Sequence, residues 1–204
     1  MPPSDDKRRF DAADLRRFFT AVDAGLSTPA TITVIGGSAI ALYGVSSGTI
    51  DIDTWGTQLP PLENAIAQAR VITKLNIPVV PAPVADVPWH FEDRLQAEPP
   101  TWTRLTVLKL EPHDLALSKA ARGFENDFAS IAALHRIIPL ELDTRVTRYI
   151  DEMGHAIGDE RQRDIKFVLM IERLFGEVEA ERVEERLRLH RKRRKTTRSR
   201  ARGN

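Results

Sequence analysis

One stretch between Val34 and Trp55, VIGGSAIALYGVSSGTIDIDTW, constrains the fold more than any other part of the chain. A β-branched run leads into two adjacent glycines, a short apolar segment comes next, and the stretch ends in an Asp-x-Asp sequence. β-branched runs that end in glycine are typical of buried strands. The pattern predicts a strand over 31–36, a short helix over 38–44 and a second strand over 49–55.

The two aspartates predict a metal site. Side chains alternate between the faces of a strand, so Asp51 and Asp53 point the same way and Ile52 points into the core. Two carboxylates on one face repel each other unless a cation lies between them, and Mg²⁺ or Mn²⁺ prefers such oxygen ligands. Taken alone, an Asp-x-Asp pair is more often a solvated strand edge or a cap. The glycine turn beside it favours the metal.

The glycine pair predicts an anion site. Gly36 and Gly37 lack a Cβ atom, so the backbone can approach a ligand closely, and the start of a helix presents N–H groups to an anion. A glycine pair in this place is otherwise simply a tight turn. Together with the aspartates it indicates a site where a nucleotide's phosphates are held beside a metal, as phosphoryl or nucleotidyl transfer requires.

The rest of the first 111 residues has the pattern of mixed α and β structure. A helix is predicted over 12–24, capped by Asp11, and a second helix over 62–76. Further strands are predicted over 77–80 and 103–110, and the segment 88–95 between them is ambiguous. The three tryptophans are expected to pack in or at the rim of the core; they are Trp55, Trp89 and Trp102.

The character of the sequence changes near residue 112, and the remainder is nearly all helical. Amphipathic segments cover 113–123, 126–137, 143–157 and 161–176, and a last helix is predicted to begin near Glu177. The fold class is therefore α+β: a small mixed sheet flanked by helices, followed by a helical C-terminal part. The predicted organisation is a flexible arm (1–9), a core (10–111), helices packed on that core (112–185) and a basic tail (186–204).

Composition excludes several classes of protein. The chain has no cysteine, which rules out disulfides and cysteine-ligated zinc sites. The first ten residues, MPPSDDKRRF, are too polar for a signal peptide, and no apolar run approaches the roughly 20 residues of a membrane helix. A cytoplasmic location without a membrane partner is expected.

The tail carries a charge that the whole-chain average conceals. Of the 30 Lys and Arg residues, ten lie in 186–204, which contains no Asp or Glu, whereas residues 1–185 hold the other 20 and all 29 acids. Such a run is typical of an arm that binds RNA phosphates in a salt-sensitive way. The alternatives are a protein partner or no specific partner. The residues at the centre of the predicted RNA contact are Arg191, Lys192, Arg193, Arg194 and Lys195.

The stretch that contains the glycine pair and the Asp-x-Asp sequence resembles a known signature. An apolar residue, then Gly-Gly, a spacer and Asp-x-Asp is similar to the motif of the polymerase-β-type nucleotidyltransferase superfamily, and GGSAIALYG…TIDIDTW resembles the bacterial branch with AbiEii-type toxins. That branch carries a second motif, which LSKAARGFENDFASI supplies as Lys119, Arg122 and Asp127. The resemblance covers residues 30–136. Its first motif comprises Ile35, Gly36, Gly37, Ser38, Asp51, Ile52 and Asp53.

The resemblance implies a reaction and assigns roles. A nucleoside monophosphate would move from an NTP substrate to a macromolecular acceptor, RNA in the favoured case, with Mg²⁺ (or Mn²⁺) as cofactor and pyrophosphate leaving. Asp51 and Asp53 would hold the metal, and Lys119 would neutralise phosphate charge. Asp127 would orient Lys119 or Arg122, or touch the nucleotide. The predicted triphosphate contacts are Gly36, Gly37 and Ser38. Likeness to the toxins also implies an antitoxin as partner.

One departure from the family pattern leaves two interpretations open. Active members usually carry a third carboxylate on a later strand, and the predicted strand over 103–110 contains none. Either the acid comes from the segment 88–95, or the site is degenerate and the protein binds nucleotide, RNA or a partner protein without turnover. The acids that flank the strand are Glu92, Asp93, Glu111 and Asp114.

Overall fold

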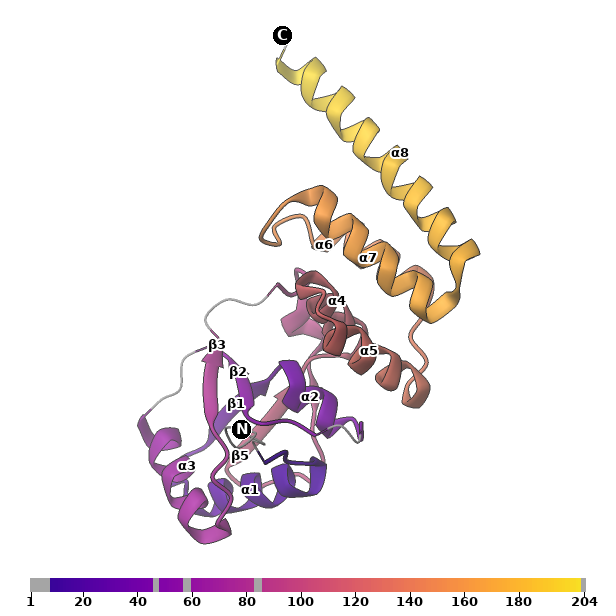
Figure 1. Ribbon diagram of the computed structural model, residues 1–204. Coiled ribbons are helices and arrows are strands. Elements are labelled where there is room, and N and C mark those ends of the chain that lie inside the picture. Colours follow the sequence, from indigo (N-terminus) through magenta and orange to yellow (C-terminus); the bar gives the residue numbers. More distant parts are fainter. Residues whose placement is uncertain (1–7, 46–47, 57–59, 83–85, 203–204) are drawn as a thin grey trace, which may run out of the picture.

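A computed structural model of the chain describes residues 8–45, 48–56, 60–82 and 86–202, and of residues 195–202 the backbone alone. The described chain confirms the predicted α+β class: one mixed sheet lies among helices, and a helical part follows it (Figure 1).

The sheet has five strands in the order β3-β2-β1-β5-β4. Its pairs β1–β5 and β2–β3 are parallel, whereas β1–β2 and β4–β5 are antiparallel. The second strand therefore lies between β1 and β3. The strand bounds are Ala30–Val34 (β1), Ile52–Trp55 (β2), Val79–Ala82 (β3), Gln96–Ala97 (β4) and Leu105–Lys109 (β5).

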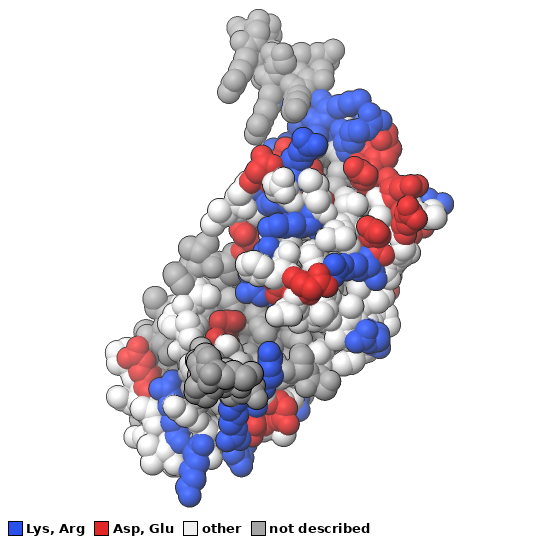
Figure 2. Space-filling model, viewed as in Figure 1, with Lys and Arg blue, Asp and Glu red and all other residues white. Residues whose placement is uncertain are grey.

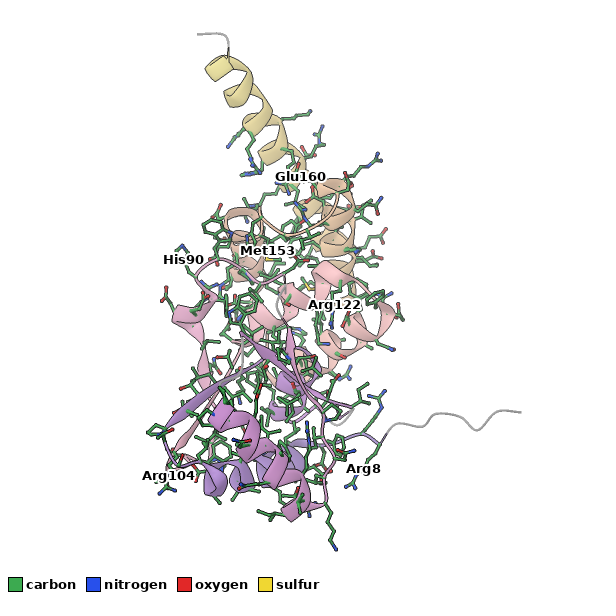
Figure 3. The ribbon with its side chains drawn as sticks, turned by 90° about the vertical axis from the view of Figure 1, so that its left-hand side faces the viewer. Arg8, His90, Arg104, Arg122, Met153 and Glu160 are labelled. Carbon is green, nitrogen blue, oxygen red and sulfur yellow. The ribbon has the colours of Figure 1, made fainter. Side chains whose placement is uncertain are left out.

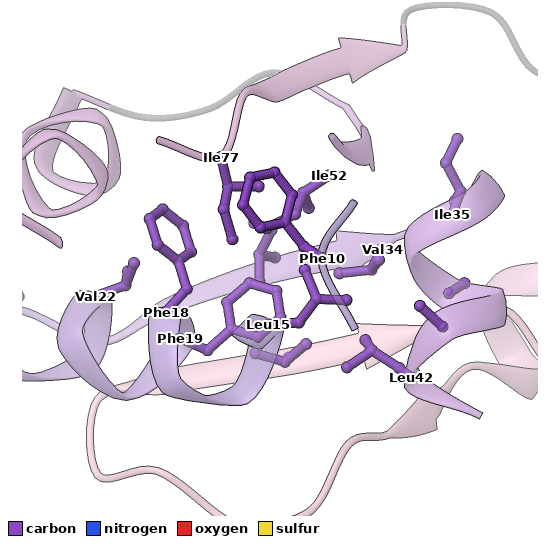
Figure 4. Close-up of a cluster of buried hydrophobic side chains, with 14 of the residues drawn as sticks. Phe10, Leu15, Phe18, Phe19, Val22, Val34, Ile35, Leu42, Ile52 and Ile77 are labelled. Carbon is purple, nitrogen blue, oxygen red and sulfur yellow. The ribbon is translucent and has the colours of Figure 1, made fainter. Parts of the chain in front are cut away.

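One face of the sheet is covered by helix α1 (Ala12–Gly25), which begins where predicted. The Asp11 carboxylate accepts a hydrogen bond of 2.9 Å from the Asp14 amide, a normal N-terminal cap. Helix α3 (Pro60–Thr73) packs beside α1. The apolar side chains of α1 point into a cluster with strand residues (Figure 4), and its buried members are Leu15, Phe18, Phe19, Ala21 and Val22.

Several predicted elements differ in their bounds, and three of the differences are as follows. The strand over 49–55 begins only at Ile52, so Asp51 lies in a bend before it. The helix over 62–76 begins at Pro60, because proline is well tolerated in a first turn. The ambiguous segment 88–95 contains a 3₁₀ helix, η1 (Phe91–Arg94), and the short β4 follows it.

The C-terminal helices form a second apolar cluster, which α4 links to the sheet. Leu115 of α4 belongs to the core under the sheet, whereas Ala116, Leu117 and Ala120 belong to the helical core. Short helix α2 lies between β1 and β2 in the chain and contacts α4. The bounds are Gly36–Leu42 (α2), Pro112–Arg122 (α4), Glu125–Ile137 (α5), Leu142–Glu152 (α6) and Glu160–Phe175 (α7).

The basic tail continues helix α8 (Glu177–Arg202), whose first half packs on α7 through Ala180, Val183 and Leu187. Its second half runs past the N-terminal end of α7 (Figure 1). Figure 2 shows Lys and Arg side chains gathered at the end of the molecule from which α8 projects. Among the described helices, none is both long and apolar enough to cross a membrane.

Candidate active site

The glycine turn wraps around Asp53. The Ile35 amide donates a 2.9 Å hydrogen bond to the Asp53 carbonyl, and the Gly37 amide donates to the Asp53 carboxylate. Gly36 has a φ of +62°, and a Cβ atom built on it would overlap Oδ2 of Asp53. Only glycine combines this backbone conformation with so close an approach. In this structure the turn therefore fixes the carboxylate, and the Gly37 amide is engaged in doing so.

Asp51 is held by Thr49. The Thr49 hydroxyl donates to the Asp51 carbonyl over 2.9 Å and lies 3.4 Å from its Oδ1. Thr49 is fixed in turn by backbone hydrogen bonds of 2.7 and 2.9 Å with Phe10. A Cβ atom on Gly37 would lie 3.0 Å from the Thr49 hydroxyl, so the glycine also makes room for this support.

The two carboxylates fit a divalent cation. Burial and the neighbouring Asp51 raise the pKa of Asp53, and Arg122 and Lys119 oppose that rise only in part. A cation between the carboxylates would relieve the repulsion, and an all-oxygen donor set suits Mg²⁺ or Mn²⁺. The described residues contain no group of three or more His, Cys, Asp or Glu that could hold a metal. Other ligands would have to come from substrate and water.

Lys119 and Arg122 meet on Asp127, which joins α4 to α5. Oδ1 of Asp127 accepts from Lys119 Nζ at 3.1 Å and from Arg122 at 2.7 Å. Burial lowers the pKa of Lys119, while Asp127 and Asp53 oppose that fall. Within the described residues, the buried Oδ2 of Asp127 has no hydrogen-bond partner. An unsatisfied buried carboxylate oxygen is costly, which points to a ligand or water as its partner.

Lys166 of α7 holds the end of α4, where this group begins. Its Nζ donates to the carbonyls of Ala121 and Arg122 over 3.1 and 2.8 Å. Gly123 ends the helix with a φ of +70°, and a Cβ atom there would lie 2.6 Å from Lys166 Cδ. The helical C-terminal part thus holds in place the end of α4 that carries Arg122.

Two cavities share one wall made of Asp53, Lys119 and Arg122. The larger has a volume of about 700 Å³ and also contains Asp51 and Gly37. The smaller measures about 310 Å³ and lies on the side of β3 and of the segment before α7. The larger cavity is completed by residues from the N-terminal segment, α2, the loop before β2 and α5, namely Arg9, Ile40, Gly48, Thr49, Ile50, Asn126, Asp127, Ala129, Ser130 and Ala133.

The structure thus brings together Gly37, Asp51, Asp53, Lys119, Arg122 and Asp127 of the predicted set in one cavity. Gly36 lines the smaller cavity instead. Ser38 is fully buried, and its hydroxyl donates to the Ile35 carbonyl over 2.9 Å, so this side chain faces neither cavity.

Arg9 lines the larger cavity but is absent from the site predicted by sequence, which places it in the flexible arm over 1–9. The pairing of Phe10 with Thr49 holds the end of that arm beside Asp51 and brings Arg9 to the cavity. The signal that the sequence offers is a basic residue just before Phe10, the first aromatic residue of the chain. Residues 1–7 lie outside the described chain.

A third carboxylate is found neither on β5, which corresponds to the strand predicted over 103–110, nor on β1 and β3, the two described strands that pair with β2. Asp53 pairs with Val80 of β3, and Val79–Ala82 contains no acid. The four flanking acids lie elsewhere. Glu92 and Asp93 are on the exposed surface of η1. Glu111 and Asp114 are engaged by Arg148 at 2.5 and 2.8 Å, in a network that also contains Arg94. None of the four lines either cavity.

The basic residues of α8 are partly used inside the protein. Arg191 is 16% exposed and pairs with Asp164 at 2.8 Å and Glu160 at 2.9 Å, and Arg194 lies 3.6 Å from Glu160. Lys192 and Arg193 are exposed. The side chain of Lys195 lies outside the described part. RNA contact by this segment stays a prediction.

Comparisons with known proteins agree with this geometry. The family described as "Nucleotidyltransferase of unknown function (DUF6036)" matches residues 14–187, which span the sheet, nearly all of both cavities and the first part of α8. Searches of curated proteins and of solved structures give no match. The matched region covers most of the chain and contains both predicted motifs, and the chain therefore belongs to this family of nucleotidyltransferases of unknown function.

Proposed function

We propose that the protein is a Mg²⁺-dependent nucleotidyltransferase that moves a nucleoside monophosphate from an NTP to an RNA acceptor. One observation carries the proposal: Asp51 and Asp53 share a cavity of about 700 Å³ with Lys119 and Arg122. Acidic residues that suit a cation and basic residues that suit phosphates on one cavity form the charge pattern of a metal–triphosphate site.

Each residue has a role in this arrangement. Asp51 and Asp53 hold Mg²⁺, which when bound neutralises phosphate charge. Lys119 and Arg122 bind phosphate oxygens. Asp127 positions both basic side chains through its Oδ1. Gly36 and Gly37 position the Asp53 carboxylate. Ser38 stabilises the turn through the hydrogen bond that its hydroxyl donates to the Ile35 carbonyl.

The reaction balances as a displacement at phosphorus. A hydroxyl oxygen of the acceptor forms a bond to the α-phosphorus, and the bond from that phosphorus to the bridging oxygen of pyrophosphate breaks. Pyrophosphate leaves with the electron pair, and the hydroxyl proton passes to solvent. The residues of this chain contribute by aligning the two substrates and by offsetting charge, which provides most of the catalysis in such reactions.

The basic charge of the C-terminal tail is the reason to propose RNA as the acceptor. Ten basic residues in 186–204, without an acid, suit an RNA backbone. The likeness to AbiEii-type toxins extends the proposal to a toxin with a cognate antitoxin.

The test is nucleotide transfer. Purified protein, Mg²⁺ and each α-labelled NTP are incubated with total RNA and total protein, beside the Asp51→Asn/Asp53→Asn variant. We expect label on RNA with wild type only. Equal labelling by the variant would refute the roles of the aspartates.

A second candidate is a degenerate site that binds nucleotide without turnover. The described strands β1, β3 and β5 contain no acid, and this favours the second candidate, because active members of the superfamily that the sequence resembles usually carry a third carboxylate on a later strand. NTP binding by calorimetry, without label on any acceptor, would support this alternative.

A further inference from the structure

The smaller cavity lies on the far side of the wall that closes the nucleotide cavity. Asp53, Lys119 and Arg122 line both cavities, whereas Asp51 lines only the larger one. In a displacement at phosphorus, the attacking and leaving oxygens lie on opposite sides of the phosphorus atom. If the triphosphate occupies the larger cavity, the smaller cavity offers a side from which a hydroxyl can attack.

The smaller cavity opens between two segments that are bonded to each other. The Ile157 amide donates to Asp86 Oδ1 over 2.9 Å, and the Trp89 amide donates to the Glu152 carbonyl over 3.2 Å. Asp86 and Ile157 line the cavity itself, together with Ser118. These two hydrogen bonds join the segment that begins at Asp86 to the end of α6 and the segment after it.

One large apolar side chain is exposed at this opening and a second lies close to it in the chain: Ile157 lines the cavity, whereas Trp89 does not line it and follows Asp86 by three residues. Ile157 is 67% exposed and Trp89 is 58% exposed, with the Trp89 ring 5.4 Å from that of His155. This exposure differs from the core or rim position that the sequence predicts for the tryptophan. An exposed indole beside a cavity gives a nucleobase a surface on which to stack, and stacking of this kind tolerates any sequence.

The basic half of α8 leaves the molecule from the same region. Glu160, the first residue of α7, follows Ile157 by three residues, a span of at most about 10 Å. Arg191 and Arg194 of α8 both reach Glu160, at 2.9 and 3.6 Å. Figure 3 shows Glu160 at the foot of the projecting part of α8, with Met153 just below it. Both arginines are paired with acids there, and the exposed Lys192 and Arg193 lie between them in the helix, so a basic segment that suits a phosphate backbone begins near the opening.

We infer that the smaller cavity is the acceptor site and that it takes the hydroxyl-bearing end of a single-stranded RNA. The terminal base stacks on Trp89, the terminal hydroxyl enters beside Asp53, and the strand continues along the basic part of α8. This inference rests on the proposed function for the transfer step, but the binding of RNA at this place can be measured without it.

The experiment uses the full chain and a short single-stranded RNA that carries fluorescein at its 5′ end. Fluorescence anisotropy gives its Kd for wild type and for Trp89→Ala, Ile157→Glu and Ser118→Trp. Loss of one base stack, or a repulsive charge at the opening, should weaken binding about tenfold. Ile72→Glu is the matched control, because Ile72 is equally exposed at 67% but lies on α3. It should bind RNA as wild type does.

Ser118→Trp fills the smaller cavity and separates the two substrate sites. We expect this variant to bind a fluorescent NTP as wild type does and to transfer no label to RNA. Circular dichroism melting shows whether it folds, and the two exposed positions, Trp89 and Ile157, keep the test decisive if it does not.

The outcomes are distinct. Wild type that binds no RNA, or that binds it no more tightly than the Trp89→Ala and Ile157→Glu variants, overturns the inference, while the nucleotide site is unaffected. Wild type that binds no NTP overturns the proposed function, whatever the RNA result. Label on a protein, abolished by Ser118→Trp, would make the acceptor a protein and overturn the assignment of RNA.

Discussion

Gly36 and Asp53 are packed so closely that a methyl group on residue 36 would overlap Oδ2 of the carboxylate. The backbone of Gly36 is also left-handed, with a φ of +62°. The glycine turn and the aspartate pair are therefore one structural unit, in which the turn sets the position of a side chain proposed to bind metal.

Gly36→Ala should abolish nucleotide transfer, because the added methyl group displaces the Asp53 carboxylate. Gly44→Ala is the matched control: its φ is +89°, but nothing lies within 4 Å of the added methyl group. Each change should cost about 1–2 kcal/mol from the left-handed backbone. Urea denaturation and transfer assays would show this. Activity retained by Gly36→Ala would contradict the fixed carboxylate.

Asp53→Asn should raise the melting temperature at neutral pH without divalent cations, by roughly 1–3 °C. Burial and Asp51 raise the pKa of Asp53 in the folded state, so that state binds the proton more tightly than the unfolded chain. Stability from this group therefore falls as pH rises from about 3.9, the ordinary Asp pKa, through the raised value. The gain from Asp53→Asn should vanish below that window.

With Mg²⁺ present, wild type should melt at a higher temperature than Asp53→Asn. The cation should raise the melting temperature of wild type by binding the folded state, and leave that of Asp53→Asn almost unchanged. Calorimetric melts over a Mg²⁺ titration would test this. An equal rise in both proteins would place the cation elsewhere.

Asp127→Ala should cost about 3–5 kcal/mol, because it leaves the buried Lys119 without its partner. Arg122→Ala should cost at most about 1 kcal/mol, since the Arg122 side chain is 48% exposed. Both should impair transfer, and Arg122→Ala should do so mainly through a higher KM for NTP. Equal losses of stability in urea would contradict the difference in burial.

Arg9→Ala should raise the KM for NTP about threefold to tenfold, as expected for the loss of one phosphate contact worth about 0.5–1.5 kcal/mol at an open site. Arg8→Ala is the control, because Arg8 pairs with Asp14 at 3.7 Å and does not line the cavity. Steady-state kinetics would compare the two. Identical values for both variants would show that Arg9 does not contact the nucleotide.

The losses of stability caused by Gly123→Ala and by Lys166→Ala should not be additive. The methyl group on Gly123 meets Lys166 Cδ at 2.6 Å and would displace the side chain that caps α4. The double variant should therefore lose about 0.5–3 kcal/mol less than the two single losses together. Gly158→Ala, with a φ of +100° and no neighbour within 4 Å, should be additive with Lys166→Ala.

The local sequence determined much of the site. Strand alternation predicts that Asp51 and Asp53 face the same way, and both line one cavity, although Asp51 lies in the bend before β2 and is held there by Thr49. The helical repeat places Lys119 and Arg122 on one face, and their side chains do meet on one carboxylate. The placement of Lys119 and Arg122 on one face depends on backbone geometry over one helical turn, whereas the position of Asp51 also depends on the pairing of Thr49 with Phe10.

Tertiary structure decided the rest. Arg9 reaches the cavity only because Phe10 pairs with Thr49, and Val80 lies beside Asp53 only through the register of β3 on β2. The exposure of Trp89 depends on how the segment before η1 meets the end of α6. These contacts join residues about 25 to 65 positions apart in the sequence. A sequence pattern indicates the structural propensity of each segment but not which segments pair, because the pairing is selected by the packing of the whole chain.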